Sequence, residues 1–429
     1  MARYEERCWE SDPDAGYSRA SQRGGRYSSY IPDPLGSRPL AVPPGLAEAA
    51  ARVERAIRAL SDQPGADGLA AISRLLTRSE AISSSRIEGV APSPQQVALA
   101  ELAISEDVRG ISAQAQLVAN NIVVLRKATE ELVSADRVAV DDVVALHDAL
   151  LPDERHHGLR RVQNWIGGND WNPIGAVFVP PPVEYVSPLI DDLIGYLNGA
   201  THGPLLQAGL VHAQFETIHP FTDGNGRVGR ALIHTALARG GTARDGVLPV
   251  SLVLATFSDR YIEMLSRYRY IGEPRTETAG AGTADWLAFF VDAAGMAVEQ
   301  ARRIAAEVAE LDGRWRTRLA ESRAAQGKRT EPRADSATAK TLNMLPEAPV
   351  LTARTVERVL GVSFLSAKQA LEELADAGVL HRKSLARNST GYLAREILDL
   401  VTIAERRLAS TRFDTRASAP NRAVPARPE

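Results

Sequence analysis

The chain has 429 residues, of which 44% are hydrophobic and 24% charged, and its formal net charge is −3. The length predicts two or three domains, and so small a net charge offers no overall attraction to nucleic acid or membranes. The single cysteine, Cys8, excludes an internal disulfide and argues against a cysteine-ligated zinc site. With no apolar signal segment or bilayer-length apolar run, we expect a cytoplasmic protein without a membrane partner.

The first 42 residues are polar, rich in Gly, Ser and Pro, and carry four tyrosines, Tyr4, Tyr17, Tyr27 and Tyr30. This composition predicts a flexible segment, or one draped over the surface. Helical periodicity then predicts an N-terminal helical region over residues 43–104, with helices at 44–60, 69–87 and 95–104. The second helix ends at Ser84-Ser85-Arg86-Ile87-Glu88-Gly89, where Gly89 suits a helix C-cap and Glu88 is then merely solvated.

A larger, mainly helical unit is predicted over residues 105–320, with helices at 113–132, 140–151, 187–197, 205–218, 227–239, 257–270 and, capped by Thr283, 285–319. Between the second and third of these helices, residues 158–168 and 176–182 are short β-like runs separated by a loop rich in Gly, Asn and Pro. They predict a hairpin whose exposed edge, at Val177, Phe178 and Val179, can pair with an extended segment of another protein. An ordinary packed hairpin is the alternative.

The most informative stretch is His219-Pro220-Phe221-Thr222-Asp223-Gly224-Asn225-Gly226-Arg227-Val228-Gly229-Arg230. Its Gly224-Asn225-Gly226 turn lies where a helix begins, so backbone N–H groups and the positive helix end form an anion nest. Arg227 and Arg230 lie three residues apart, and both can reach the same side of that nest to bind phosphate oxygens.

Two further groups in this stretch carry chemistry. Asp223 supplies a hard oxygen ligand suited to Mg²⁺, which usually binds through one or two carboxylates together with substrate phosphates. His219 is the group in the segment that can take a proton near neutral pH. Together with the anion nest, these residues predict a phosphate-transfer site.

A small C-terminal domain is predicted over residues 336–408, after a polar linker at 321–335 and before a disordered basic tail at 409–429. Helices at 338–345, 352–360 and 364–377, followed by strands at 379–385 and 392–393 around a polar wing, resemble a winged helix-turn-helix domain. The candidate recognition helix carries Lys368 but also three acidic residues, Glu372, Glu373 and Asp376. The wing and tail are more basic, with His381, Arg382, Lys383, Arg387, Arg406, Arg407, Arg412 and Arg416. Because phosphate contacts supply most nonspecific DNA affinity, this mixture leaves DNA binding and a protein or homodimer contact as alternatives.

The run from His219 to Arg230 resembles the signature of the Fic (Fic/Doc) family, His-Pro-Phe-x-Asp/Glu-Gly-Asn-Gly-Arg-x-x-Arg, at every specified position. The resemblance implies a mainly α fold, in which the 158–182 hairpin is a flap, and transfer of AMP from ATP to a protein hydroxyl. It implies that His219 deprotonates the hydroxyl of a Ser, Thr or Tyr, in a target or in the chain itself. Asp223 then holds Mg²⁺, the N–H groups near Gly224, Asn225 and Gly226 take developing charge, and Arg227 and Arg230 hold the β- and γ-phosphates.

Residues 84–89 also resemble the family's inhibitory motif, Ser/Thr-x-x-x-Glu-Gly/Asn, through Ser84, Glu88 and Gly89. The resemblance implies that Glu88 pairs with Arg230 and leaves ATP in a pose poor for in-line attack. Two alternatives to transfer stay open. One is hydrolytic removal of AMP at the same site, with Glu88 positioning water. The other is a transcription regulator in which the winged helix is the working part and the nucleotide only a signal.

Overall fold

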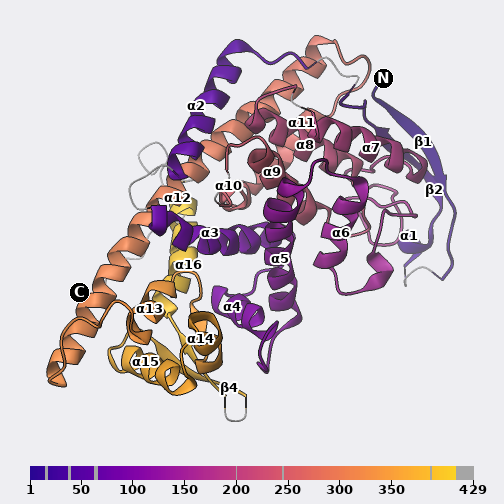
Figure 1. Cartoon of the computed structure of the whole chain (residues 1–429). Coiled ribbons are helices and arrows are strands. Elements are labelled where there is room, and N and C mark those ends of the chain that lie inside the picture. The colour runs from indigo at the N-terminus through magenta and orange to yellow at the C-terminus, as the bar shows by residue number, and fades with distance from the viewer. Residues whose placement is uncertain are drawn as a thin grey trace, which may run out of the picture. The chain divides into compact units, whose positions relative to one another are not determined.

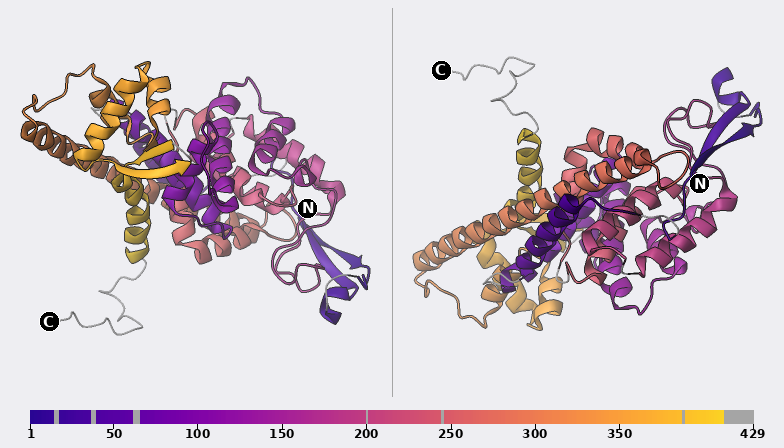
Figure 2. Two further views of the ribbon diagram at one scale, coloured as in Figure 1. Left: turned by 90° about the horizontal axis from the view of Figure 1, so that it is seen from below. Right: turned by 90° about the horizontal axis from the view of Figure 1, so that it is seen from above.

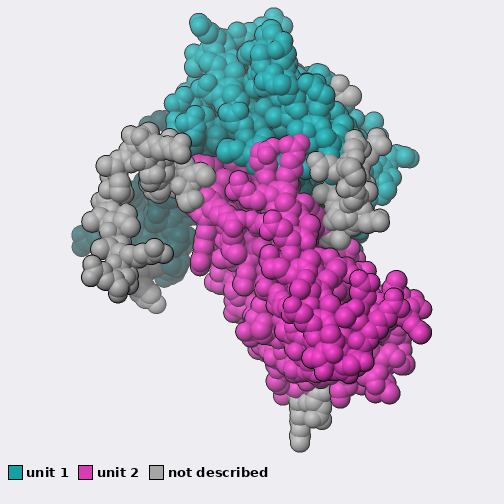
Figure 3. Space-filling view, turned by 90° about the vertical axis from the view of Figure 1, so that its left-hand side faces the viewer, with its two compact units in different colours: residues 1–63, 120–248, 259–298 teal, residues 64–119, 249–258, 299–429 magenta. Residues whose placement is uncertain are grey.

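The computed structural model describes residues 1–14, 18–36, 40–61, 66–199, 201–243, 246–386 and 389–411. The chain is mainly helical, which confirms the predicted fold class (Figure 1). It divides into two compact units (Figure 3): unit 1 contains residues 1–63, 120–248 and 259–298, and unit 2 contains residues 64–119, 249–258 and 299–429. Several predictions fall outside the described residues, namely those on Tyr17, Arg387 and the tail beyond Thr411 with Arg412 and Arg416.

Unit 1 is built around two consecutive helices that pack along each other, α8 (Pro204–Ile218) and α9 (Asn225–Arg239). Nearly every residue of α8 is buried, because apolar and small side chains surround the whole helix. At Gly209 of α8, a Cβ atom would lie 2.9 Å from the ring of Phe290, so glycine allows a close helix approach. The remaining helices, wholly or largely in this unit, are α1 (Arg19–Gln22), α2 (Pro44–Ser61), α6 (Val140–Leu150), α7 (Val186–Leu197), α11 (Ser258–Tyr268) and the short turns η1 (Glu154–His156) and η2 (Val183–Tyr185).

Two long helices run through both units, α5 (Ala113–Ser134) and α12 (Glu277–Ala325). The prediction that Thr283 caps the second of these is wrong. The helix begins at Glu277, and the side-chain oxygen of Thr276 accepts the N–H of Ala279 at 3.3 Å, as an N-cap does. Thr283 lies inside the helix, where its hydroxyl donates to Ala279 O at 2.9 Å.

The N-terminal segment contains an antiparallel strand pair, β1 (Arg3–Trp9) and β2 (Gly25–Ile31), drawn in indigo in Figure 2. The flexible alternative is therefore wrong for these two stretches, whereas a segment draped over the surface remains a prediction. Their aromatic residues explain the order, because Tyr4 packs against Tyr30 and Trp9 against both Tyr27 and Trp165, with ring centroids 5.3 to 6.3 Å apart.

Unit 2 contains α3 (Ala66–Ile87), α4 (Pro94–Ala103), α10 (Val250–Thr256), α13 (Ala337–Met344), α14 (Ala353–Leu360), α15 (Phe364–Asp376) and α16 (Arg395–Thr411). Its antiparallel sheet has the order β3-β5-β4, formed by β3 (Val350–Leu351), β5 (Ser389–Leu393) and β4 (His381–Ala386). Three of these helices, α13, α14 and α15, and the β4–β5 pair follow the predicted order. The elements α10, β3 and α16 were not predicted. Assignment of this region as a winged helix remains a prediction.

Among the helices in the described ranges, none has both the length and the apolar character needed to cross a bilayer.

Candidate functional site

The loop between α8 and α9 has a backbone that only a few residue types adopt. His219 ends α8 with φ +52°, and it is the one non-glycine residue in the described ranges with a positive φ. Its N–H donates to Phe215 O at 2.8 Å. Gly224, with φ +77°, precedes α9, and a Cβ there would lie 2.8 Å from the Leu150 side chain. A left-handed histidine persists only where its surroundings hold it, and such strained residues cluster at functional sites.

Side chains inside and outside the motif fix this loop. The Asn225 amide accepts the Phe221 N–H and donates to Phe221 O, both at 2.8 Å. The Phe221 ring is fully buried and stacks on His147 of α6, with ring centroids 3.9 Å apart. His147 Nε2 lies 3.1 Å from Asp223 O, so this nitrogen is the protonated one that donates. The side chain of Asn225, one of the predicted site residues, therefore stabilises the conformation of the loop.

His219 has the charge state that a general base needs. Burial, followed by the positive charge of Arg160, lowers the pKa of the imidazole to about 4. The ring is therefore neutral at physiological pH and has a lone pair free to accept a proton. Its side chain is only 18% exposed, and Nδ1 lies 3.9 Å from the carboxylate of Glu216.

The anion nest at the start of α9 differs in one donor from the prediction. The Gly224 N–H donates to Asp223 Oδ1 at 2.6 Å. The first hydrogen bond of the helix runs from Val228 N–H to Gly224 O, so the N–H groups of residues 225–227 precede the helical ladder. These later N–H groups are the candidate donors of the predicted nest. Arg227 and Arg230, both under 4% exposed, supply buried positive charge on the same helix.

Asp223 fits a magnesium ion held jointly with a nucleotide. Its side chain is 61% exposed, and its Oδ1 lies 3.5 Å from the Arg227 guanidinium. The described ranges contain no group of three or more His, Cys, Asp or Glu able to hold a metal by themselves. Because Mg²⁺ usually takes one or two carboxylates and completes its shell with phosphate oxygens and water, one exposed aspartate beside an anion nest is a suitable donor set.

Replacement of Asp223 with Ala tests this assignment. We expect ATP affinity to lose its dependence on Mg²⁺ and any transfer rate to fall roughly a hundredfold or more, since charge stabilisation is the largest catalytic term in such sites. Titration calorimetry with ATP, with and without Mg²⁺, measures the first effect. Asp141→Ala, an exposed aspartate on α6, is the matched control. Equal Mg²⁺ dependence in Asp223→Ala and wild type would remove Asp223 from the metal role.

The flap is less regular than predicted. In place of two strands, the described residues contain an isolated bridge between Ile166 and Phe178, whose backbone bond, Ile166 N–H to Phe178 O, is 2.8 Å long. Gly167 and Gly168 have positive φ angles, and the prolines at 180–182 have no N–H, so a longer ladder cannot form.

The three predicted docking residues have different surroundings. Val177 is 82% exposed, whereas Phe178 and Val179 are 6% and 5% exposed. The Phe178 ring lies 3.8 Å below the Arg269 guanidinium, and Val179 O accepts the N–H of Tyr30 from β2 at 2.9 Å. Only Val177 of the three therefore faces outward, and the flap displays three more exposed apolar residues, Val162, Ile166 and Trp171.

The predicted inhibitory segment forms the end of α3. Gly89 has φ +80°, and its N–H donates to Arg86 O at 2.9 Å, so the helix ends at a left-handed glycine as predicted. Ser84 is buried and Glu88 is half-buried. Glu88 belongs to unit 2 and Arg230 to unit 1, and their pairing remains a proposal.

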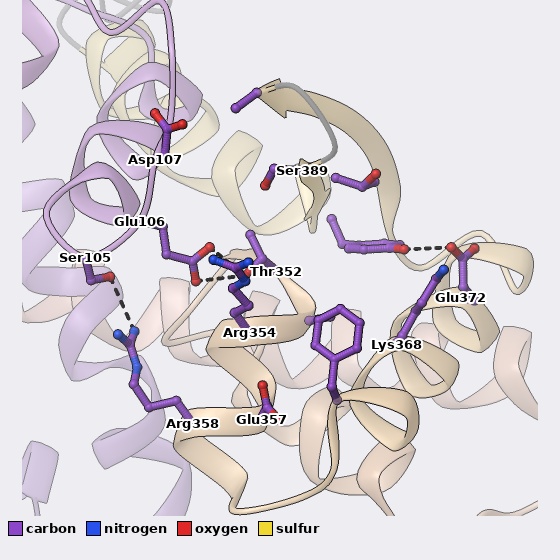
Figure 4. A pocket seen from close by; sticks show the side chains of 15 residues that line it. Ser105, Glu106, Asp107, Thr352, Arg354, Glu357, Arg358, Lys368, Glu372 and Ser389 are labelled. Carbon is purple, nitrogen blue, oxygen red and sulfur yellow. Dashed lines mark hydrogen bonds between the residues drawn. The ribbon is translucent and has the colours of Figure 1, made fainter.

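Unit 2 has a groove of about 870 Å³ between α14, α15 and residues 105–107 (Figure 4). Its lining mixes cations and carboxylates, namely Arg354, Arg358 and Lys368 with Glu106, Asp107, Glu357 and Glu372. The Glu106 carboxylate accepts the Thr352 hydroxyl at 2.7 Å, at the start of α14. On β4, Arg382 pairs with Glu372 and Asp376 of α15. Acidic partners thus neutralise cations that DNA phosphates would need, which weakens the DNA-binding alternative.

A neutral buried imidazole, an exposed aspartate and a helix start with two buried arginines thus lie together within residues 219–230. Residues 137–237 match the model of the Fic/DOC family. This finding confirms the resemblance drawn from the His219–Arg230 signature.

Curated relatives share this part of the chain. The protein adenylyltransferase fic-1 of Caenorhabditis elegans is 30% identical over 165 residues, which cover 33% of this chain and 30% of that protein. A probable protein adenylyltransferase of Aquifex aeolicus is 44% identical over 68 residues, 16% of this chain and 21% of that protein. The chain thus spans less than a third of the length of these relatives. A Fic family protein of Desulfovibrio desulfuricans, known from its crystal structure, has a TM-score of 0.50 and 21% identity, covering 83% of this chain and 98% of that one, which supports the fold.

Three residues of this site were not predicted: His147, Arg160 and Asn164. Each reaches the loop from a distant segment, and no motif marked them. His147 is one of two polar residues in the apolar run 143–150, and Arg160 and Asn164 are two of several polar residues between 158 and 168, and such signals are too common to single out a site.

Proposed function

We propose that the chain is a protein adenylyltransferase that transfers AMP from ATP to a Ser, Thr or Tyr hydroxyl of a target protein. The observation that carries the proposal is the neutral imidazole of His219 at the end of α8, followed by α9, whose first turn carries the N–H groups that precede the helical ladder and two buried arginines. The names of the curated relatives, which are protein adenylyltransferases, support the same activity.

In the proposed reaction, His219 takes the proton from the target hydroxyl as the hydroxyl oxygen attacks the α-phosphorus of ATP. The bond from that phosphorus to the bridging oxygen breaks, and pyrophosphate leaves with the electron pair. The N–H donors of Asn225 and Gly226 and the positive end of α9 stabilise charge on the phosphoryl oxygens. Arg227 and Arg230 orient the β- and γ-phosphates. Mg²⁺, held by Asp223 and the phosphates, supplies further charge neutralisation when bound.

Incubation of the protein with cell lysate and ATP labelled at the α-phosphate tests the proposal. Transfer predicts labelled protein in excess of released AMP. The competing hydrolytic activity predicts the reverse with pre-modified protein, namely free AMP and loss of label. A protein that neither adds nor removes AMP in either assay would contradict both readings.

We also propose that Glu88 restrains this activity by pairing with Arg230 when no correctly bound nucleotide occupies the site. The left-handed Gly89 that ends α3 supports the proposal, because it fixes where the helix stops and so where Glu88 projects. The exposed apolar residues of the flap support a third element, docking of an extended target segment beside Val177.

Substitution of proline at Val177 tests the docking role. The Val177 N–H donates to Ile166 O at 2.9 Å, and proline removes this donor and disturbs the flap edge. We expect target labelling to fall at least roughly tenfold while ATP affinity stays unchanged, because a small misplacement of the reacting group has effects of that order or larger.

Val177→Ala is the matched control, since it removes the exposed side chain but keeps the N–H. If docking depends on the main chain, alanine retains most of the labelling that proline loses. Equal loss of target labelling and ATP affinity in Val177→Pro would show general disruption of the site and would leave the flap without a docking role.

A further inference from the structure

Arg160 connects both sides of the flap to the catalytic loop. It lies in the first half of the flap and is 3% exposed. Its Nε donates to His219 O at 2.9 Å, and its backbone N–H donates to Pro220 O at 2.8 Å. Its two terminal nitrogens donate to carbonyl oxygens of the flap, Nη1 to Val162 O at 3.2 Å and Nη2 to Pro181 O. One buried side chain thus touches the start of the flap, its end and the backbone of the proposed base.

A guanidinium suits this place because its planar fork presents five N–H donors in a fixed geometry. Here the guanidinium donates to three carbonyl oxygens, those of Val162, Pro181 and His219. Burial lowers the pKa of Arg160 to about 10, which still leaves it charged at neutral pH. The carbonyl dipoles satisfy its hydrogen bonds but do not cancel its charge, so its positive field reaches the neighbouring imidazole.

The left-handed backbone of His219 requires such support. A non-glycine residue in this conformation stores strain and stays there only when its surroundings determine it from several sides. The Phe215 carbonyl holds the His219 N–H, and Arg160 holds the His219 carbonyl, so both flanking peptide groups are fixed. Asn164, from the same flap segment, makes a second hydrogen bond to this loop, in which its side-chain amide donates to Phe221 O at 2.8 Å.

We propose that Arg160 is a positioning residue that holds the base of the flap and the His219 backbone in one geometry, so that a target docked on the flap meets a correctly placed imidazole. The inference deepens the proposed function and depends on it for the role of His219 as base. Burial is the largest cause of the low pKa of His219. The charge of Arg160 lowers that pKa further, with a smaller effect of Arg269 in the same direction and of Asp223 in the opposite one, and so keeps the base ready to accept a proton.

Two substitutions separate the charge of Arg160 from its geometry. Arg160→Gln removes the charge and keeps an amide donor, whereas Arg160→Lys keeps the charge but loses the planar fork. Arg161→Gln is the matched control, because it removes the same charge from the next residue, which is exposed. All four proteins are labelled with ¹³C in their eight histidines, and His219→Asn identifies the His219 signal.

The His219 signal is followed between about pH 5 and about pH 8, the interval in which an ordinary histidine changes charge. We expect a flat response in wild type, Arg161→Gln and Arg160→Lys, and the onset of protonation at the acid end in Arg160→Gln. Target labelling at saturating ATP should fall roughly tenfold to a hundredfold in both Arg160 variants, with ATP affinity unchanged.

Unchanged His219 titration together with wild-type labelling in a folded Arg160→Gln protein would overturn the inference. If Arg160→Gln does not fold, the Arg160→Lys protein provides the test. Lysine lacks the planar guanidinium, so target labelling at the wild-type level by Arg160→Lys would also overturn the inference. A failure of the proposed function can be distinguished from a failure of this inference. A wild type that never labels protein contradicts AMP transfer, while the titration of Arg160→Gln still supports or overturns the contact between Arg160 and His219.

Discussion

Replacement of His219 with Ala is expected to abolish AMP transfer while leaving ATP binding nearly intact. The phosphate-binding groups lie elsewhere, in the first turn of α9 and in the side chains of Arg227 and Arg230, so the nucleotide loses no contact. The attacking hydroxyl loses its proton acceptor, and general-base catalysis contributes roughly 10² to 10⁴ in rate. Titration calorimetry measures ATP affinity, and labelling from α-labelled ATP measures transfer.

An exposed histidine provides the control, since His381→Ala removes an imidazole from β4 in unit 2. It should transfer AMP like wild type. Transfer at the wild-type rate by His219→Ala would show that another group takes the proton. Loss of ATP binding in parallel with transfer would show that His219 supports the nucleotide site and would leave its role as base unsupported.

Replacement of Glu88 with Gly is expected to raise self-labelling, at an N-terminal tyrosine or serine among other hydroxyls. If Glu88 pairs with Arg230, its removal frees a guanidinium for the γ-phosphate. A gain of roughly 5- to 150-fold corresponds to the usual coupling free energies between two sites. Truncation of one partner of a buried ion pair destabilises a fold by about 3–5 kcal/mol, and ATP supplies a replacement anion. Thermal protection by ATP should therefore exceed that of wild type.

Arg230→Ala separates release from catalysis. It should be inactive alone and remain inactive when combined with Glu88→Gly, because release has no effect without the arginine that orients the phosphates. Glu88→Gln, which keeps the size of the side chain and removes its charge, should behave like Glu88→Gly. If neither Glu88 variant labels better than wild type, residues 84–89 are only a capped helix end.

The sequence revealed the parts of the site that are contiguous. His219, Asp223, Arg227 and Arg230 lie within one loop and one helix turn, so their spacing alone brings them together. The helices on either side were equally predictable, because α8 and α9 consist of long runs with local hydrogen bonds and strong apolar content.

The errors occur where structure depends on distant partners. The strand pair β1–β2 joins residues 16 to 28 positions apart, from Trp9 with Gly25 to Arg3 with Ile31, and its aromatic contacts are hidden in a polar composition. The flap shows the opposite error, since its β-like residues form only one bridge between positive-φ glycines and a run of prolines. Arg160 reaches the loop across fifty-nine positions of sequence, and no local pattern predicts that contact.

The central claim, that the site from His219 to Arg230 transfers AMP, is tested most directly with the Glu88→Gly protein and two isotopic forms of ATP. One form carries its label at the α-phosphate and the other at the γ-phosphate. We predict label in protein from the α-labelled form alone, a mass increase of one adenylyl group, and no label when His219→Ala is added to the same protein. Label from the γ-phosphate, or equal α-labelling with and without His219, would contradict the account.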